Sequence, residues 1–110
     1  MIYHLAEPAD WEQAHDSGAY DSSTRGIRLE QQGFIHACKD HDQLKRVAQT
    51  IYADKPQLLL LTMDEEKLEA AGLEVRYEPG DSRDPNSEVF PHIYGGAIPL
   101  DLIECERYQA

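Results

Sequence analysis

The chain has 110 residues, of which 41% are hydrophobic and 28% charged, so it is long enough for one core and typical of a single globular domain over residues 1–110. Its 10 basic and 21 acidic side chains give a net charge of -11, which disfavours binding to the phosphate backbone of nucleic acids. No apolar run approaches the roughly 20 residues that span a membrane, and the first residues lack the features of a secretory signal, so we expect a cytoplasmic protein.

The first third of the sequence alternates between strand and helix patterns. Residues 2–6 (IYHLA) predict a short strand. Residues 7–18 predict a helix that has Pro8 in its first turn and stops at Gly18. The polar and aperiodic residues 19–32 indicate a connection.

Residues 33–38 (GFIHAC) predict a second strand, whose successive side chains point to opposite faces. One face would carry Phe34, His36 and Cys38, and the other would carry Ile35 and Ala37. The next stretch has apolar residues at helical spacing, which favours a helix over 41–53.

Asp40 or Asp42 is the expected N-cap of this helix, and Pro56 should lie beyond its end. Residues 57–63 (QLLLLTM) are apolar on both faces, as in a central strand that is covered on both sides. Residues 64–72 predict a short helix or turn.

Two further strands are predicted near the end of the chain. Residues 73–79 alternate between apolar and charged side chains, which indicates a half-exposed strand with Glu74, Arg76 and Glu78 facing outward. Residues 102–108 alternate again. The predicted fold is therefore α+β, with two main helices packed on a mostly antiparallel, split sheet of five or six strands, and we expect the strands at 57–63 and 73–78 to share one sheet.

His36 and Cys38 would be neighbours on one face of their strand. One interpretation is a metal site completed by His92 and His4, but zinc sites need three or four ligands and no further ligand spacing supports one. The other interpretation, which the spacing favours, is a buried, hydrogen-bonded histidine beside a core cysteine.

A polar loop at residues 79–87 is rich in turn-forming residues and longer than most connections. Such loops are either binding loops or simple exposed insertions. Arg76 and Arg83 are the basic groups near this loop, and in so acidic a stretch each is expected to pair with a neighbouring carboxylate.

The stretch after this loop, residues 88–96 (EVFPHIYGG), combines polar and aromatic side chains. If it is extended, one face carries Glu88, Phe90, His92 and Tyr94. A carboxylate, an imidazole and a phenol in one row can grip a polar ring or supply a general base. The same row can equally be the wet face of an edge strand.

The motifs GFIHAC, EVRYEP and EVFPHIYGGAIPLDLI, with the aromatic-rich start of the chain, resemble an uncharacterised bacterial family, domain of unknown function nine-five-two, over essentially the whole sequence. In that family Ser or Thr commonly stands two residues after the strand histidine, where this sequence has Cys38. The family has been grouped with the ADP-ribosyltransferase-like fold, whose members hold NAD in a cleft between two small sheets.

This resemblance implies roles for several residues. His36 would hold the nicotinamide and its ribose, Tyr94 would stack on the ligand, and Glu88 would be the acid near the ribose. The candidate catalytic residues are thus Glu88 and His92, and the candidate ligand-binding residues are His36, Cys38, Tyr94 and Arg76. The implied function is binding of NAD or a nucleotide-like ligand, with ADP-ribosyl or glycosyl transfer through an oxocarbenium-like ribose.

Two alternatives come from other functional classes. One is a non-catalytic module for a small polar ligand or a partner protein, and the other is a metal-dependent enzyme built on His36, Cys38 and His92. For the ligand site we expect His36, His92 and Tyr94 to converge on one solvent-accessible cavity, with partly exposed imidazoles that contribute little to packing.

Overall fold

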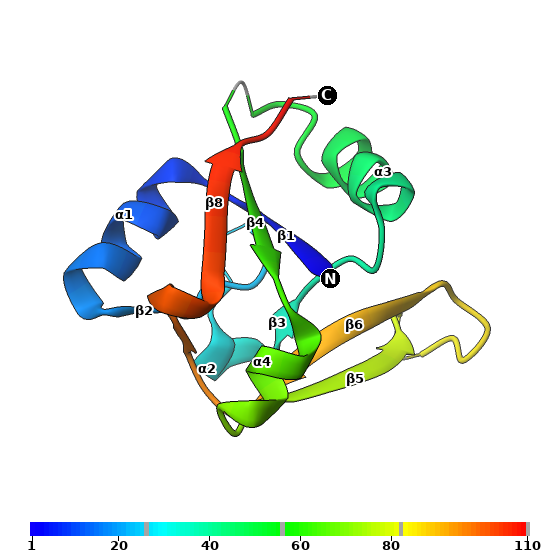
Figure 1. The fold of residues 1–110 in the computed structure, drawn as a ribbon. Helices are drawn as coiled ribbons and strands as arrows, with labels where there is room; N and C mark the ends of the chain where they lie inside the picture. The colour runs from blue at the N-terminus through cyan, green and yellow to red at the C-terminus, as the bar shows by residue number, and fades with distance from the viewer. Residues whose placement is uncertain (26, 56, 82, 110) are drawn as a thin grey trace.

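The structure is a computed structural model that describes residues 1–25, 27–55, 57–81 and 83–109. Figure 1 shows its two three-stranded sheets, a short two-stranded ribbon and the helices packed around them. All paired strands run antiparallel, and the predicted α+β class is confirmed. Within the described residues, no helix is both long and apolar enough to cross a lipid bilayer.

The strand β4 (Leu59–Met63) is the centre of the first sheet, between β1 (Ile2–Ala6) and β8 (Ile103–Arg107). Its side chains alternate between two apolar clusters, so that Leu61 packs in the main core and Leu60 in a second, smaller cluster. The apolar run therefore forms a central strand that is covered on both faces, as the sequence predicts.

The second sheet has β6 (Val89–Tyr94) at its centre, between β3 (Ile35–His36) and β5 (Glu74–Pro79). The strands β5 and β6 form a hairpin, and the Gly80 N–H donates to the Glu88 carbonyl at 2.8 Å where the long loop begins. The predicted strand at 73–79 is confirmed, and the condition that 88–94 is extended is met by β6. Only two residues of the predicted 33–38 strand are paired with β6.

The expectation that residues 57–63 and 73–78 belong to one sheet is wrong. The strands β1 and β8 pair with both edges of β4, so no edge of β4 remains for β5. The short helix α4 (Glu65–Ala70) and Gly72, which has a φ of 92°, redirect the chain between the two strands. A positive φ of this size favours glycine, so the sequence can make this turn without steric strain.

A pair of backbone hydrogen bonds joins the two sheets. The Tyr3 N–H donates to the Cys38 carbonyl at 2.8 Å, and the Cys38 N–H donates to the Tyr3 carbonyl at 2.6 Å. One residue earlier, the Ala37 N–H donates to the Pro91 carbonyl at 2.9 Å. Because successive backbone groups of a strand point to opposite sides, this segment contacts β1 on one side and β6 on the other.

The helix α1 (Pro8–Ser17) begins and ends where the sequence predicts, directly before Gly18. The expected connection at 19–32, however, contains the strand β2 (Ala19–Tyr20) and the helix α2 (Leu29–Gln32). The partner of β2 is β7 (Ile98–Pro99), which a 3-10 helix, η1 (Leu100–Leu102), joins to β8.

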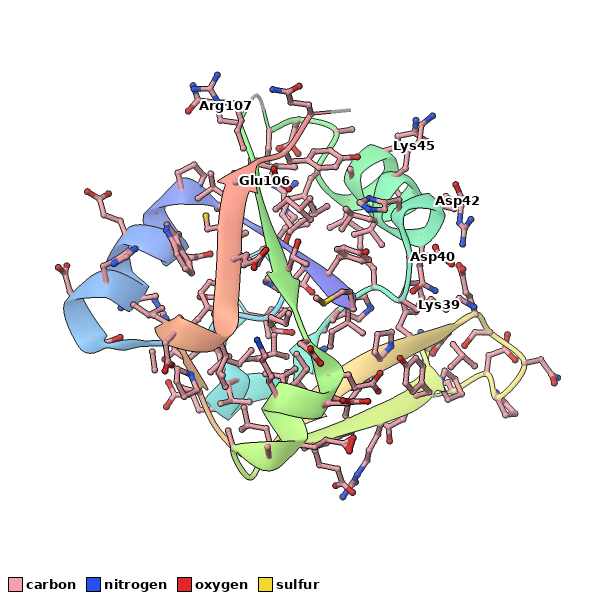
Figure 2. The ribbon with its side chains drawn as sticks, viewed as in Figure 1. Lys39, Asp40, Asp42, Lys45, Glu106 and Arg107 are labelled. Carbon is pink, nitrogen blue, oxygen red and sulfur yellow. The ribbon has the colours of Figure 1, made fainter. Side chains whose placement is uncertain are left out.

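The second main helix, α3 (His41–Ile51), covers the smaller apolar cluster. Its N-cap is Asp40, whose carboxylate accepts a hydrogen bond from the Gln43 N–H at 2.8 Å. Figure 2 shows Asp40 at the start of this helix and Lys45 further along it. Pro56, expected beyond the helix end, lies outside the described residues.

Replacing Asp40 with Ala should lower the free energy of unfolding by about 1 kcal/mol, because the Gln43 N–H loses its acceptor. Asp40→Asn is the matched control, since its amide oxygen can accept the same bond. Urea unfolding at pH 7 measures both variants. If Asp40→Ala is as stable as Asp40→Asn, the cap does not contribute as described.

Candidate functional site

A pocket of about 520 Å³ lies beside the β5–β6 hairpin. Its wall is formed by Glu78 from β5, His92 and Tyr94 from β6, and Phe34 from the segment before β3. The other lining residues come from α2 and from the hairpin and its loop: Gln32, Pro79, Gly80 and Pro85. This volume lies within the range of about 300–1,000 Å³ that is common for small-molecule sites.

The Glu78 carboxylate is the polar centre of this pocket. Its Oε1 accepts a hydrogen bond from the Tyr94 hydroxyl at 2.5 Å and another from His92 Nδ1 at 2.9 Å. Because a carboxylate only accepts, Nδ1 of His92 carries the ring proton and Nε2 has the lone pair when His92 is neutral. The three side chains thus form one connected group.

Protonation in this group follows from its hydrogen bonds. The bond from Tyr94 is the main cause that lowers the pKa of Glu78, and the bond from His92 adds to it. Partial burial and the neighbouring Glu78 raise the pKa of Tyr94 to about 12. At neutral pH the pocket therefore holds an ionised carboxylate and a protonated phenol.

His92 is almost fully buried, with 3% of its surface exposed. Its ring stacks on Phe34, with 4.0 Å between ring centroids and 18° between the planes. Nε2 has no hydrogen-bond partner among the described residues. The expectation of a partly exposed imidazole at this position is wrong, because Phe34 covers one face of the ring and the Glu78 carboxylate binds its Nδ1.

His36 lies next to this pocket but does not line it. It pairs with His92 across β3 and β6, and its ring lies 5.3 Å from that of His92 and 4.6 Å from that of Phe90. The cavity that His36 does line has a volume of only about 10 Å³, which is hardly room for one water molecule. The structure therefore brings His92 and Tyr94 into one pocket, whereas His36 lines a separate, much smaller cavity.

Glu88 is not the acid of this pocket. Its carboxylate forms an ion pair with Arg46 of α3 and accepts a hydrogen bond from the Gln43 amide at 3.1 Å. The acid beside His92 is Glu78, which the alternation of β5 placed on an outward face. Glu78 does lie on the polar face of β5, and the pairing of β5 with β6 turns this face toward the side chains of His92 and Tyr94. The apolar face of β5 is the more open one at Tyr77, which is 48% exposed.

The remaining predicted binding residues have structural partners. The Arg76 guanidinium lies 4.4 Å from the centre of the Tyr94 ring and pairs with Glu74 at 2.6 Å. Arg83 pairs with Asp81, as expected for the basic groups of this acidic stretch. Cys38 is buried in the smaller apolar cluster, and burial raises the pKa of its thiol to about 12.

His4 is a polar core residue whose partners the sequence did not reveal. Its Nδ1 donates to the His36 carbonyl at 2.6 Å, so its Nε2 accepts from the Tyr20 hydroxyl at 2.7 Å. Burial lowers the pKa of His4 to about 4 and is also the main cause that lowers the pKa of His36 to about 4. Both imidazoles are therefore neutral at pH 7.

The metal-site interpretation finds no geometric support. Over the described residues, no three His, Cys, Asp or Glu side chains gather closely enough to hold a metal ion. His36 and His92 are neighbours, and His36 and Cys38 line the same cavity of about 10 Å³, but Cys38 packs in the smaller apolar cluster and the three side chains do not form a metal-binding group.

Comparisons with known proteins agree with the sequence resemblance. The family described as "Protein of unknown function (DUF952)" matches residues 5–105. The crystal structure of protein CC0527 from Caulobacter crescentus is similar to this fold, with a TM-score of 0.74 and 19% identity over 98% of this chain and 85% of that chain. A double mutant of CC0527 matches equally well. No curated protein matches the chain.

The lowered pKa values of His4 and His36 predict a loss of stability in acid. In the unfolded chain an imidazole titrates near pH 6.5, whereas His4 and His36 titrate near pH 4 when folded. The stability that each neutral histidine contributes is therefore fully present above about pH 6.5. Protonation of each histidine should lower the free energy of unfolding by about 2 kcal/mol at pH 4.5.

Urea unfolding at pH 7 and pH 4.5 measures this loss in the unmodified chain and in His36→Gln. The variant should lose less stability between the two pH values, by roughly one histidine's share. An equal loss in both proteins would show that the pKa of His36 does not fall on folding.

Proposed function

The chain belongs to the DUF952 family, and we propose that its pocket of Phe34, Glu78, His92 and Tyr94 binds the nucleoside part of an NAD-type ligand. We propose ADP-ribosyl or glycosyl transfer as the reaction and the cytoplasm as its setting. The observation that carries this proposal is the ionised Glu78 carboxylate, held by two side chains on the wall of a pocket that also contains an aromatic platform.

A fixed carboxylate is suited to a ribose. The two hydroxyls of a ribose can donate to one carboxylate, as acidic residues do in dinucleotide-binding sites. Glu78 keeps acceptor capacity after binding Tyr94 and His92, because both of these donate to the same oxygen, Oε1. Its second oxygen carries no hydrogen bond from a described residue and is available to a ligand.

The aromatic wall is suited to a planar base. Phe34 covers His92 with one face, and the Phe34 ring also lies 5.4 Å from the Tyr94 ring. Stacking of a base on aromatic side chains contributes about 1–3 kcal/mol in nucleic-acid-binding proteins. A base that stacks here would place its ribose toward Glu78.

The charge of the site restricts recognition to the nucleoside. Glu78 is the charged group of the lining, while Arg76 already pairs with Glu74 and Arg83 with Asp81. Phosphate groups would find little compensation for their charge here, so we place them toward solvent. The proposal therefore predicts that a nucleoside alone retains most of the affinity.

In the proposed reaction the bond between ribose C1′ and the nicotinamide nitrogen breaks, and the electron pair leaves with nicotinamide. The ribose becomes an oxocarbenium-like cation, which an acceptor nucleophile then attacks. A carboxylate beside the ribose would stabilise the developing positive charge, as acidic residues do in glycoside hydrolysis. Tyr94 and His92 contribute by holding Glu78 ionised and fixed in place.

Ligand binding tests the pocket directly. Nicotinamide riboside or NAD at a hundred times its dissociation constant should raise the free energy of unfolding by about 2.7 kcal/mol, visible as a higher melting temperature. Glu78→Gln should lose most of this gain because it removes the charge with little change in shape. Glu88→Gln is the matched control, since Glu88 lies outside the pocket, and it should bind like the unmodified chain.

Two results would contradict this binding site. One is that neither compound stabilises the unmodified chain at millimolar concentration. The other is that Glu78→Gln and Glu88→Gln respond alike.

Release of nicotinamide from NAD separates an enzyme from a binding module. If the chain is an enzyme, the unmodified chain should release nicotinamide from NAD, and Glu78→Gln should not. Chromatography measures the nicotinamide. A non-catalytic module for a small polar ligand would show the stabilisation without release, and would replace the transferase part of the proposal.

A further inference from the structure

We infer that a second pocket, between α3 and the end of β8, binds a small amphipathic carboxylate. This pocket, named here the α3 groove, has a volume of about 430 Å³ and is lined by Lys45, Ala48, Gln49, Tyr52, Leu58 and Tyr108, with Lys55 at one end. It shares no lining residue with the pocket of Glu78, so the inference does not depend on the proposed function.

The floor of the α3 groove is apolar and well supported. Tyr52 and Leu58 are 4% and 7% exposed and belong to the smaller apolar cluster, together with the partly buried Ala48 and Tyr108. The Tyr108 N–H donates to the Leu58 carbonyl at 2.9 Å, which holds one wall of the groove beside the other. An apolar ligand body would lie against a surface that already has a fixed shape.

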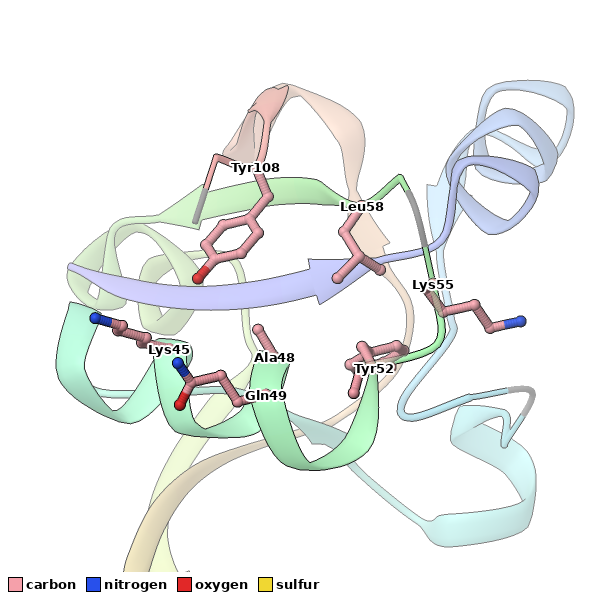
Figure 3. A pocket seen from close by; sticks show the side chains of 8 residues that line it. Lys45, Ala48, Gln49, Tyr52, Lys55, Leu58 and Tyr108 are labelled. Carbon is pink, nitrogen blue, oxygen red and sulfur yellow. The ribbon is translucent and has the colours of Figure 1, made fainter.

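The two ends of the groove differ in their charge partners. Lys55 forms an ion pair with Glu7 at 3.1 Å, so its charge is already compensated. Lys45 forms no ion pair within the described part of the chain. Figure 3 shows Lys45 at the opposite end from Lys55, with the Gln49 amide and the Tyr108 hydroxyl on the Lys45 side.

This arrangement is unusual for a protein with a net charge of -11. Two lysines line the groove, and no Asp or Glu does so among the described residues. Lys45, Gln49 and Tyr108 can all donate hydrogen bonds to an anion, and the Lys45 ammonium supplies the charge. Charge complementarity therefore places a carboxylate at the Lys45 end and an apolar body over Ala48 and Leu58.

The size of the groove indicates a small molecule as the occupant. A volume of about 430 Å³ suits a ligand with one short apolar body. A single uncompensated lysine matches one negative charge, whereas an acidic peptide would bring several charges to a protein that repels them.

Octanoate is the probe, with octanol as its uncharged counterpart and acetate as the same headgroup without an apolar body. Isothermal titration calorimetry should detect octanoate binding at millimolar concentration or below, at least tenfold tighter than octanol or acetate. Lys45→Gln should weaken octanoate binding at least tenfold. Gln49→Glu should do the same, because it places a carboxylate beside the ligand's own. Lys67→Gln, on α4, is the matched lysine control and should bind normally.

The melting temperatures of the three variants check that each is folded, and binding should weaken as salt rises. The inference is overturned if octanoate does not bind the unmodified chain, if octanol binds as tightly, or if Lys45→Gln and Lys67→Gln are indistinguishable. Binding of a polyglutamate peptide in preference to octanoate would also overturn it and would assign the groove to an acidic protein partner.

Discussion

The reciprocal backbone hydrogen bonds between Tyr3 and Cys38 join the two sheets, and the position of the candidate site depends on them. They fix the segment directly after β3 against β1, while β3 itself pairs with β6. The buried His4 reinforces the same junction, because its ring bonds the His36 carbonyl and the Tyr20 hydroxyl. With β3 held in this way, β6 and β5 follow in antiparallel register, and His92, Tyr94 and Glu78 meet on one wall.

The junction and the pocket divide the polar groups into two kinds. His4 and His36 lie in surroundings that lower their pKa values, so both rings are neutral at pH 7, and the ring of His4 forms hydrogen bonds within the core. Glu78 is ionised at the pocket wall, because Tyr94 and His92 both donate to it. The buried Nε2 of His92 has no described partner, and a buried polar atom of this kind usually costs free energy unless water or a ligand bonds to it. The site thus places one ionised carboxylate, that of Glu78, next to a sheet junction whose imidazoles, those of His4 and His36, are uncharged.

The sequence predicts much of this arrangement, and its failures have a common physical cause. Alternation along β6 correctly placed His92 and Tyr94 on one face, and the apolar run of β4 correctly indicated a strand covered on both sides. The choice of acid failed because the register of a hairpin with a long loop cannot be inferred from either strand alone. The ion pair between Arg46 and Glu88 could not be predicted either, because the two residues are distant in the sequence. The strand β2 was missed because it pairs with β7 through only two residues, too few to leave a periodic pattern.

The most direct test of the central claim is a crystal structure of the chain soaked with nicotinamide riboside. The proposal predicts the base against Phe34 and a ribose hydroxyl within hydrogen-bonding distance of the second carboxylate oxygen of Glu78. It also predicts that the carboxylate keeps its bonds to Tyr94 and His92. Nicotinamide riboside bound elsewhere, for example in the α3 groove, with the pocket of Glu78 holding only water, would contradict the claim.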